Sequence, residues 1–171
     1  MTIHKTPKDI GIGDKERVFF VAEAGINHNG SVDTALELIK VAKDCGADAV
    51  KFQKRTVSRI LTKEGLNKPY ENPNSFGKTY GEHKDFLELS FDDFRKMKSY
   101  ADEIGIIFMA SGWDEESVDF LDSIGVSIFK MASADLTNLP LLVHTANKKK
   151  PMILSTGMAD LDIVKEAYEV V

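Results

Sequence analysis

The chain has 171 residues, of which 43% are hydrophobic and 29% are charged, values ordinary for one globular domain or one large piece of a domain. Its formal net charge of −5 and its pI near 5.4 argue against nucleic acid or an anionic membrane surface as the main partner. No apolar run approaches the ~18 residues of a membrane span, and the first residues lack the apolar core of a signal peptide.

The single cysteine, Cys45, cannot form an internal disulfide, which favours the reducing cytoplasm as the compartment. Cys45 follows a helical pattern and precedes Gly46, so we expect a buried structural thiol. The four histidines show no metal-ligand spacing, so we expect no metal site made by this chain's own residues.

Five apolar runs alternate with helix-like segments, a pattern that predicts an α/β protein with a parallel sheet. The predicted strands cover residues 18–22, 47–53, 106–110, 126–129 and 151–154, and the predicted helices cover 32–44, 90–104, 114–123, 138–150 and 160–171. Residues 1–17 are expected to form a leader or short hairpin, and residues 18–171 one domain. The stretch 54–90 is unusually long and irregular, which is typical of a lid or binding loop.

Each apolar run ends in polar side chains: Glu23, Lys51 with Gln53, Ser111, Lys130 with Ser133 and Asp135, and Ser155. In parallel α/β proteins, ligands bind at the carboxyl ends of the strands, so these groups are expected to share a site. The two lysines and the serine hydroxyls suit a small ligand that carries phosphate and carboxylate.

Two alternatives remain open at this point. Glu23 or Asp135 could act as acid, base or charge stabiliser beside a bound anion, whereas Lys51 or Lys130 could instead form a Schiff base with a carbonyl substrate. Asn27, in the turn after the first strand, fits a capped turn and a ligand contact equally well.

The count of strands also fits two folds. Five strands could form a flavodoxin-like sheet, whereas a (β/α)₈ TIM barrel takes roughly 250 residues, so as a barrel the chain would contain about five of eight units. A last helix that runs to Val171 favours the second interpretation, in which the chain is the N-terminal portion of a barrel.

Four stretches and one loop are distinctive together: residues 21–30 (VAEAGINHNG), 46–53 (GADAVKFQ), 129–135 (FKMASAD) and 151–158 (PMILSTGM), and the loop 77–83 (GKTYGEH). In the four stretches the sequence resembles the N-terminal part of the sialic acid (N-acetylneuraminate) synthases, and the loop is similar to the branch that makes N-acetylneuraminate or its 9-phosphate. The resemblance implies an incomplete (β/α)₈ TIM barrel and the condensation of phosphoenolpyruvate with N-acetylmannosamine or its 6-phosphate, with release of phosphate.

The resemblance also implies roles for individual residues. The positions of Lys51, Ser111, Lys130, Ser133 and Ser155 hold phosphoenolpyruvate, and Glu23 lies near the reacting carbons. Gln53 and Asp135 are expected toward the sugar, and Asn27 and Tyr80 are further expected substrate-binding residues. Ala132 and Ala134 stand where the family has glycines, a departure that bears on substrate preference.

Further implications concern groups outside the chain. The family uses a divalent metal, Mn²⁺ or Mg²⁺, whose two histidine ligands lie in later strands, and its full-length members are expected to be cytoplasmic homodimers. The isolated 171 residues are therefore expected to be inactive. The alternatives are a legionaminate or pseudaminate synthase, or a non-catalytic half-barrel that binds anions.

Overall fold

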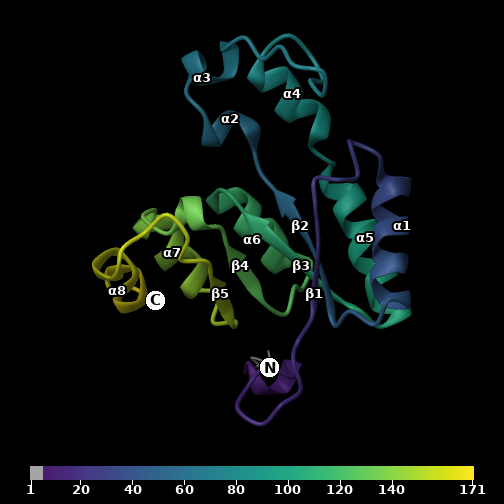
Figure 1. Ribbon diagram of the computed structural model, residues 1–171, viewed down its shortest axis with the longest axis vertical. Helices are drawn as coiled ribbons and strands as arrows, with labels where there is room; N and C mark the ends of the chain where they lie inside the picture. The colour runs from purple at the N-terminus through teal and green to yellow at the C-terminus, as the bar shows by residue number, and fades with distance from the viewer. Residues whose placement is uncertain (1–5) are drawn as a thin grey trace.

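The computed structural model describes residues 6–171, so the first five residues of the expected leader lie outside the described part. Five parallel strands form one sheet in the order β1-β2-β3-β4-β5, so each strand pairs with the next one along the chain (Figure 1). The strands are Val21–Gly25, Ala49–Lys54, Ile107–Gly112, Phe129–Met131 and Met152–Leu154. This order excludes the flavodoxin-like alternative, whose second strand lies outside the first, and it is the order of a TIM barrel.

Eight α-helices connect or flank these strands in the described residues. They are α1 Val32–Asp44, α2 Val57–Ile60, α3 Lys63–Asn67, α4 Tyr80–Leu87, α5 Phe91–Ile104, α6 Glu115–Ser123, α7 Leu139–Ala146 and α8 Leu161–Glu169. The longer ones begin at polar caps, as the sequence predicts: Ser90 and Asp93 form a capping box at the start of α5, and Gly105 ends that helix with φ 72°. None of the described helices is both long and apolar enough to cross a bilayer.

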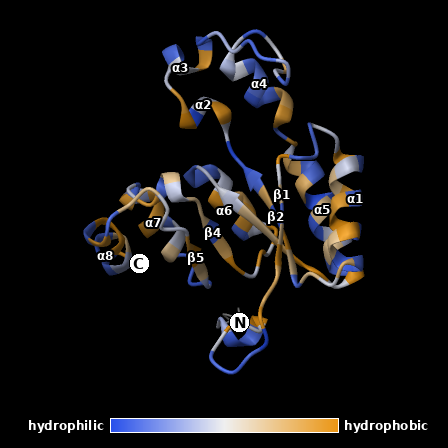
Figure 2. Ribbon diagram, in the orientation of Figure 1, coloured by the Kyte–Doolittle hydropathy of each residue, from blue (hydrophilic) through white to orange (hydrophobic). Residues whose placement is uncertain are grey.

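The sheet has two apolar faces because alternate residues of each strand point to opposite sides. On the outer face, residues such as Val50, Phe52 and Phe108 pack against the helices, where α1 and α5 lie side by side (Figures 1 and 2). On the inner face, Ala49, Met109 and Ile128 form a smaller apolar cluster with Ile10. Ile10 belongs to a 3₁₀ helix, Lys8–Ile10, so the segment before β1 covers the amino ends of the strands. Residues 6–17 form this helix and turns, with no strand among them.

Two predicted strands are displaced along the chain. The first was expected at residues 18–22, but β1 begins at Val21, because Arg17 and the backbone N–H of Phe20 bind the Asp48 carboxylate before the ladder starts. Phe20 is 60% exposed there. The fourth was expected at residues 126–129, but the backbone N–H of Val126 donates to Leu121 and closes the end of α6, so β4 starts at Phe129.

Three further expectations were wrong. The stretch 54–90 is not irregular throughout, since α2, α3 and α4 fold within it and stand beyond the carboxyl end of β2 (Figure 1). We call residues 56–87 the excursion. Cys45 is exposed at the C-cap of α1, whereas a buried thiol was expected. The last helix ends at Glu169 and does not continue to Val171.

Candidate active site

Apolar and polar side chains share the inner face of the sheet, and the polar ones lie nearer the carboxyl ends of the strands. In β2, for example, Ala49 joins the inner apolar cluster, and Lys51 and Gln53 follow on the same face at a spacing of two. The same succession places Glu23, Ser111, Lys130 and Ser155 two residues after Val21, Met109, Ile128 and Ile153, which all belong to or pack on that cluster. The strand pattern therefore directs all of these polar groups toward the inside of the barrel.

Lys51 and Glu23 form an ion pair across the first two strands. The two residues are register partners, and Lys51 Nζ lies 2.9 Å from Glu23 Oε2. The lysine side chain is only 7% exposed whereas the carboxylate is 62% exposed. A buried ammonium needs a negative partner, and Glu23 supplies it while keeping one side open to solvent or ligand.

Lys130 faces this pair from β4. Its Nζ donates hydrogen bonds to Ser155 Oγ at 2.6 Å and to the Met131 carbonyl oxygen at 2.7 Å. Burial lowers the pKa of Lys130, and the neighbouring charge of Lys51 lowers it further, whereas Glu23 acts in the opposite direction. Among residues 6–171, Lys51 and Lys130 thus both interact with Glu23 and repel each other, so an anionic ligand placed between them would relieve their repulsion.

Two serines complete this group, which we call the lysine cluster. Ser111 is buried in β3 as the register partner of Lys130. Ser133 begins the 3₁₀ helix Ser133–Asp135, and Gly157 passes so close to it that a Cβ there would lie 3.0 Å from Ser133 Oγ. The expected site residues from four strands and two following loops therefore lie on one side of the sheet.

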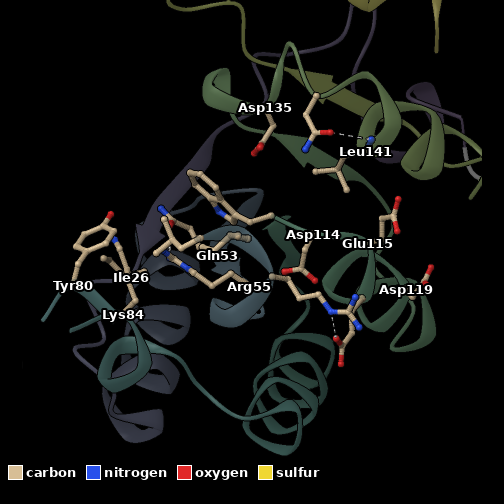
Figure 3. Close-up of a pocket in the computed structure, with 16 residues that line it drawn as sticks. Ile26, Gln53, Arg55, Tyr80, Lys84, Asp114, Glu115, Asp119, Asp135 and Leu141 are labelled. Atoms are coloured by element: carbon tan, nitrogen blue, oxygen red, sulfur yellow. Dashed lines mark hydrogen bonds and ion pairs between the residues drawn. The ribbon is translucent and has the colours of Figure 1, made fainter. Parts of the chain in front are cut away.

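An open cleft of about 1030 Å³ lies between the excursion and the carboxyl ends of β2, β3 and β4 (Figure 3). Three of the predicted site residues line it: Gln53, Tyr80 and Asp135. Burial raises the pKa of Asp135, and its Oδ2 has no hydrogen-bond partner among the described residues. Such an acceptor in a cleft wall suits a ligand that carries hydroxyl or amide donors.

Several cleft residues were not predicted from the sequence. Arg55 and Trp113 line the cleft between Gln53 and the start of α6, and Arg59 and Lys84 line it from α2 and α4. A signal was present for the first two, since Arg55 continues the Lys51–Gln53 alternation and Trp113 stands two residues after Ser111. Nothing local in the sequence indicates that α2 and α4 fold back toward β2.

Asn27 is the predicted site residue that lies apart from the others. It is exposed in the turn after β1, where its backbone N–H donates to the Ala24 carbonyl, and it does not line the cleft. Its neighbour His28 is buried, and its Nδ1 accepts from the backbone N–H of Gly30 at 3.1 Å. Burial, with a smaller contribution from Arg55, lowers the pKa of His28 to about 4.

The described residues do not by themselves fit a metal ion. Among residues 6–171, no group of three or more His, Cys, Asp or Glu side chains is arranged to hold one. The free carboxyl oxygen of Asp135 is a single donor, which is fewer than a divalent cation requires.

Comparison with known proteins decides the family. The sequence model of the NeuB family matches residues 38–171. The chain belongs to the NeuB family. It is 46% identical over 160 residues to the N-acetylneuraminate-9-phosphate synthase of Mus musculus, and 43% identical over 160 residues to the N,N'-diacetyllegionaminic acid synthase of Legionella pneumophila. These matches cover 94% and 93% of this chain but only 45% of each relative, so this NeuB-family chain spans less than half of their length.

A solved structure of a protein of related name has the same fold as this NeuB-family chain. The N-acetylneuraminic acid synthetase of Leptospira borgpetersenii, in complex with citrate, superposes with a TM-score of 0.76 at 30% identity. The match covers 93% of this chain and 51% of that one. The fold is therefore a partial TIM barrel, as the strand order indicates.

Proposed function

We propose that this chain carries the phosphoenolpyruvate-binding half of a synthase that condenses phosphoenolpyruvate with an N-acetylhexosamine and releases phosphate. The observation that carries the proposal is the lysine cluster, in which Lys51 and Lys130 face each other with Glu23 as the one carboxylate near both. Phosphoenolpyruvate has two anionic groups, a phosphate and a carboxylate, which match two ammonium groups and the serine hydroxyls around them. Relatives named as synthases of N-acetylneuraminate 9-phosphate and of legionaminic acid support the reaction class.

In the proposed reaction, C3 of phosphoenolpyruvate forms a bond to the aldehyde carbon of the open-chain sugar. Water adds at C2, and the resulting tetrahedral intermediate loses phosphate to leave a 2-keto acid. Lys51, Lys130 and the hydroxyls of Ser111, Ser133 and Ser155 hold the two anionic groups. Glu23, paired with Lys51 and open on one side, is placed to hold or move a proton at the water that adds to C2.

The sugar is proposed to occupy the cleft beneath the excursion. Gln53, Tyr80 and Asp135 line this cleft, whereas Asn27, in the turn after β1, does not. An N-acetylmannosamine-type sugar is the first candidate, because of the 46% identity to the mouse enzyme. The 43% identity to the Legionella enzyme supports a diacetamido sugar of legionaminate synthesis as the second candidate.

The resemblance supports three further proposals about the complete protein. It would require a divalent metal, Mn²⁺ or Mg²⁺, with ligands outside the residues described here, and it would act as a homodimer. The unpaired Cys45 favours the cytoplasm as its compartment. Removal of the metal with a chelator, followed by its restoration, tests the first of these by the loss and return of phosphate release.

The test of the proposed function is phosphate release by the complete protein with phosphoenolpyruvate and, in turn, N-acetylmannosamine, its 6-phosphate and a diacetamido sugar. Lys51→Met and Lys130→Met should each reduce kcat/KM by at least about a hundredfold, because each leaves an anionic group without its counter-charge. Lys40→Met is the matched control, since Lys40 forms an ion pair with Asp44 on the surface of α1. Absence of phosphate release with every sugar would refute the proposal. Phosphoenolpyruvate binding without turnover would instead favour the anion-binding half-barrel.

A further inference from the structure

Gln53 is held by a buried arginine, and this contact fixes which end of its amide faces the cleft. Arg55 Nη2 donates a hydrogen bond to Gln53 Oε1 at 2.6 Å. A guanidinium has donors only, so the amide oxygen must face it and the NH₂ group must point elsewhere. Gln53 Nε2 lies over Gly25, where a Cβ would be 3.6 Å away, and Gln53 lines the cleft.

Arg55 is itself fixed from three sides. Its side chain is 5% exposed, its Nε lies 3.2 Å from Glu88 Oε2, and its guanidinium lies 5.5 Å from the centre of the Trp113 ring. A lysine at this position would have no planar fork with which to bind a carboxylate and an amide oxygen together. The position therefore requires the geometry of arginine as well as its charge.

The Glu88 carboxylate joins the two ends of the excursion. Its Oε1 accepts from Lys54 Nζ at 2.7 Å and from the backbone N–H of Arg55 at 3.1 Å, and Lys54 Nζ also donates to the Leu89 carbonyl at 2.9 Å. Burial raises the pKa of Glu88, whereas the positive charges of Lys54 and Arg55 lower it. The residues that close the excursion are thus the same residues that set the position of Arg55.

We propose that Arg55, anchored by Glu88, is a positioning residue that engages the Gln53 amide oxygen and so turns the Gln53 NH₂ group to the sugar as a hydrogen-bond donor. The group that Gln53 recognises is then an acceptor, such as a hydroxyl oxygen or the carbonyl oxygen of an N-acyl substituent. This inference rests on the proposed function for the identity of the ligand, whereas the orientation of the amide rests on the contacts above.

A kinetic double-mutant cycle in the complete protein tests the positioning role. Arg55→Met should raise the KM for the N-acetylhexosamine about tenfold, the effect of losing one charge-assisted hydrogen bond, and leave the KM for phosphoenolpyruvate within about twofold. In a Gln53→Ala background, Arg55→Met should raise the sugar KM no further, because the group it positions is gone. Arg55→Lys should also show a higher KM for the sugar than the unmutated protein, because lysine keeps the charge but not the planar guanidinium. Arg95→Met is the matched control, since Arg95 lies on α5 and pairs with Asp92 outside the cleft.

A spectroscopic test does not depend on turnover. Gln53 is the only glutamine among the 171 residues, so ¹⁵N-glutamine labelling gives one side-chain amide signal from this chain, which Gln53→Glu identifies by its loss. Arg55→Met should move that signal, and Arg95→Met should leave it in place. An unmoved signal in Arg55→Met, or equal sugar-KM increases in both backgrounds of the cycle, would overturn the inference. Absence of turnover in the unmutated protein would count against the proposed function, while the amide signal would still decide the orientation of Gln53.

Discussion

At the scale of single residues, the lysine cluster combines burial with like charge, and this combination makes its affinity for anions depend on pH. Burial and the charge of Lys51 both lower the pKa of Lys130 below its ordinary value of 10.5. The protonated form is the one that binds an anion, so phosphoenolpyruvate affinity should fall as the pH rises through this lowered pKa. The fall should therefore begin at a lower pH than an unperturbed lysine would give.

Lys130→Arg provides the comparison, because a guanidinium stays protonated throughout the accessible range. Calorimetric titration with phosphoenolpyruvate between about pH 7 and 10 should show a falling affinity in the unmutated protein and a flatter curve in the variant. Parallel curves for the two proteins would show that Lys130 is not the titrating group.

His28 makes the stability of the fold depend on pH in the acid range. Its folded-state pKa of about 4 lies below the ordinary value of 6.5, so the unfolded chain binds a proton more readily than the folded one. The contribution of His28 is constant above pH 6.5 and becomes destabilising as the pH falls from 6.5 toward 4, with a total of about 3 kcal/mol.

Denaturant unfolding of His28→Asn at several pH values measures this contribution. The asparagine oxygen can accept from the Gly30 N–H in place of Nδ1 but does not titrate in this range. The variant should therefore lose less unfolding free energy between pH 6.5 and 4 than the unmutated protein does. An equal loss in both proteins would assign the acid sensitivity to other groups.

At the scale of elements, the excursion is held against the turn after β1 by a close backbone approach. Gly30 has φ +77°, and a Cβ there would lie 2.5 Å from the carbonyl oxygen of Phe86 in α4. Gly11 has nearly the same backbone, with φ +80°, but nothing lies within 4 Å of its Cβ position. Comparing alanine substitutions at Gly11 and Gly30 therefore distinguishes the cost of backbone strain at positive φ from the cost of steric conflict with α4.

Gly11→Ala should cost about 1 kcal/mol of unfolding free energy, the ordinary strain of an L-residue at positive φ. Gly30→Ala should cost about 2 kcal/mol more, because a backbone atom cannot move aside as a flexible side chain can. Thermal and denaturant unfolding of the two variants measures the difference. Equal costs would mean that the contact between the turn and α4 yields without penalty.

Sequence periodicity predicts α1, α5, α6 and α8 to within a residue or two, because polar caps such as Ser90 and a terminal glycine such as Gly105 mark helix ends. The helix expected at 138–150 is shorter, since α7 ends at Ala146. It predicts the strands less well, because an apolar run such as 18–22 does not reveal where ladder pairing begins. The polar strand ends were predictable from the alternation along each strand. The part of the cleft wall that Arg59 and Lys84 form was not predictable from the sequence. Its position depends on ion pairs between Glu88 and two residues far from it in the chain, Lys54 and Arg55, which we call the clamp.

At the scale of the whole molecule, the sheet has two unpaired edges in the described part of the chain, at β1 and β5. Apolar side chains stand exposed near both: Val18 is 69% exposed, and Met158 and Leu161 are each 84% exposed. Unpaired edges flanked by apolar side chains favour association between copies of a chain. The 171 residues produced by themselves should therefore self-associate.

Sedimentation velocity across a range of concentrations measures this association. The double variant Met158→Lys, Leu161→Lys should shift the population toward the monomer, because it places two like charges on the apolar region after β5. Val41→Lys on α1 is the control, since Val41 is 47% exposed but belongs neither to the segment before β1 nor to the segment after β5. A monomeric unmutated chain, or an equal effect of Val41→Lys, would contradict the expectation.

The clamp formed by Lys54, Arg55 and Glu88 also bears on how this fold can diversify within the NeuB family. It ties together two points 34 residues apart, so the chain between them begins and ends at the same place whatever its internal sequence. The cost of closing a loop grows only slowly with its length, so insertions and deletions inside the excursion need not displace β2 or β3. The lysine cluster on the strands can thus remain constant while the excursion is exchanged. Under the proposed function, the sugar aldehyde that is attacked can then change while phosphoenolpyruvate stays the same.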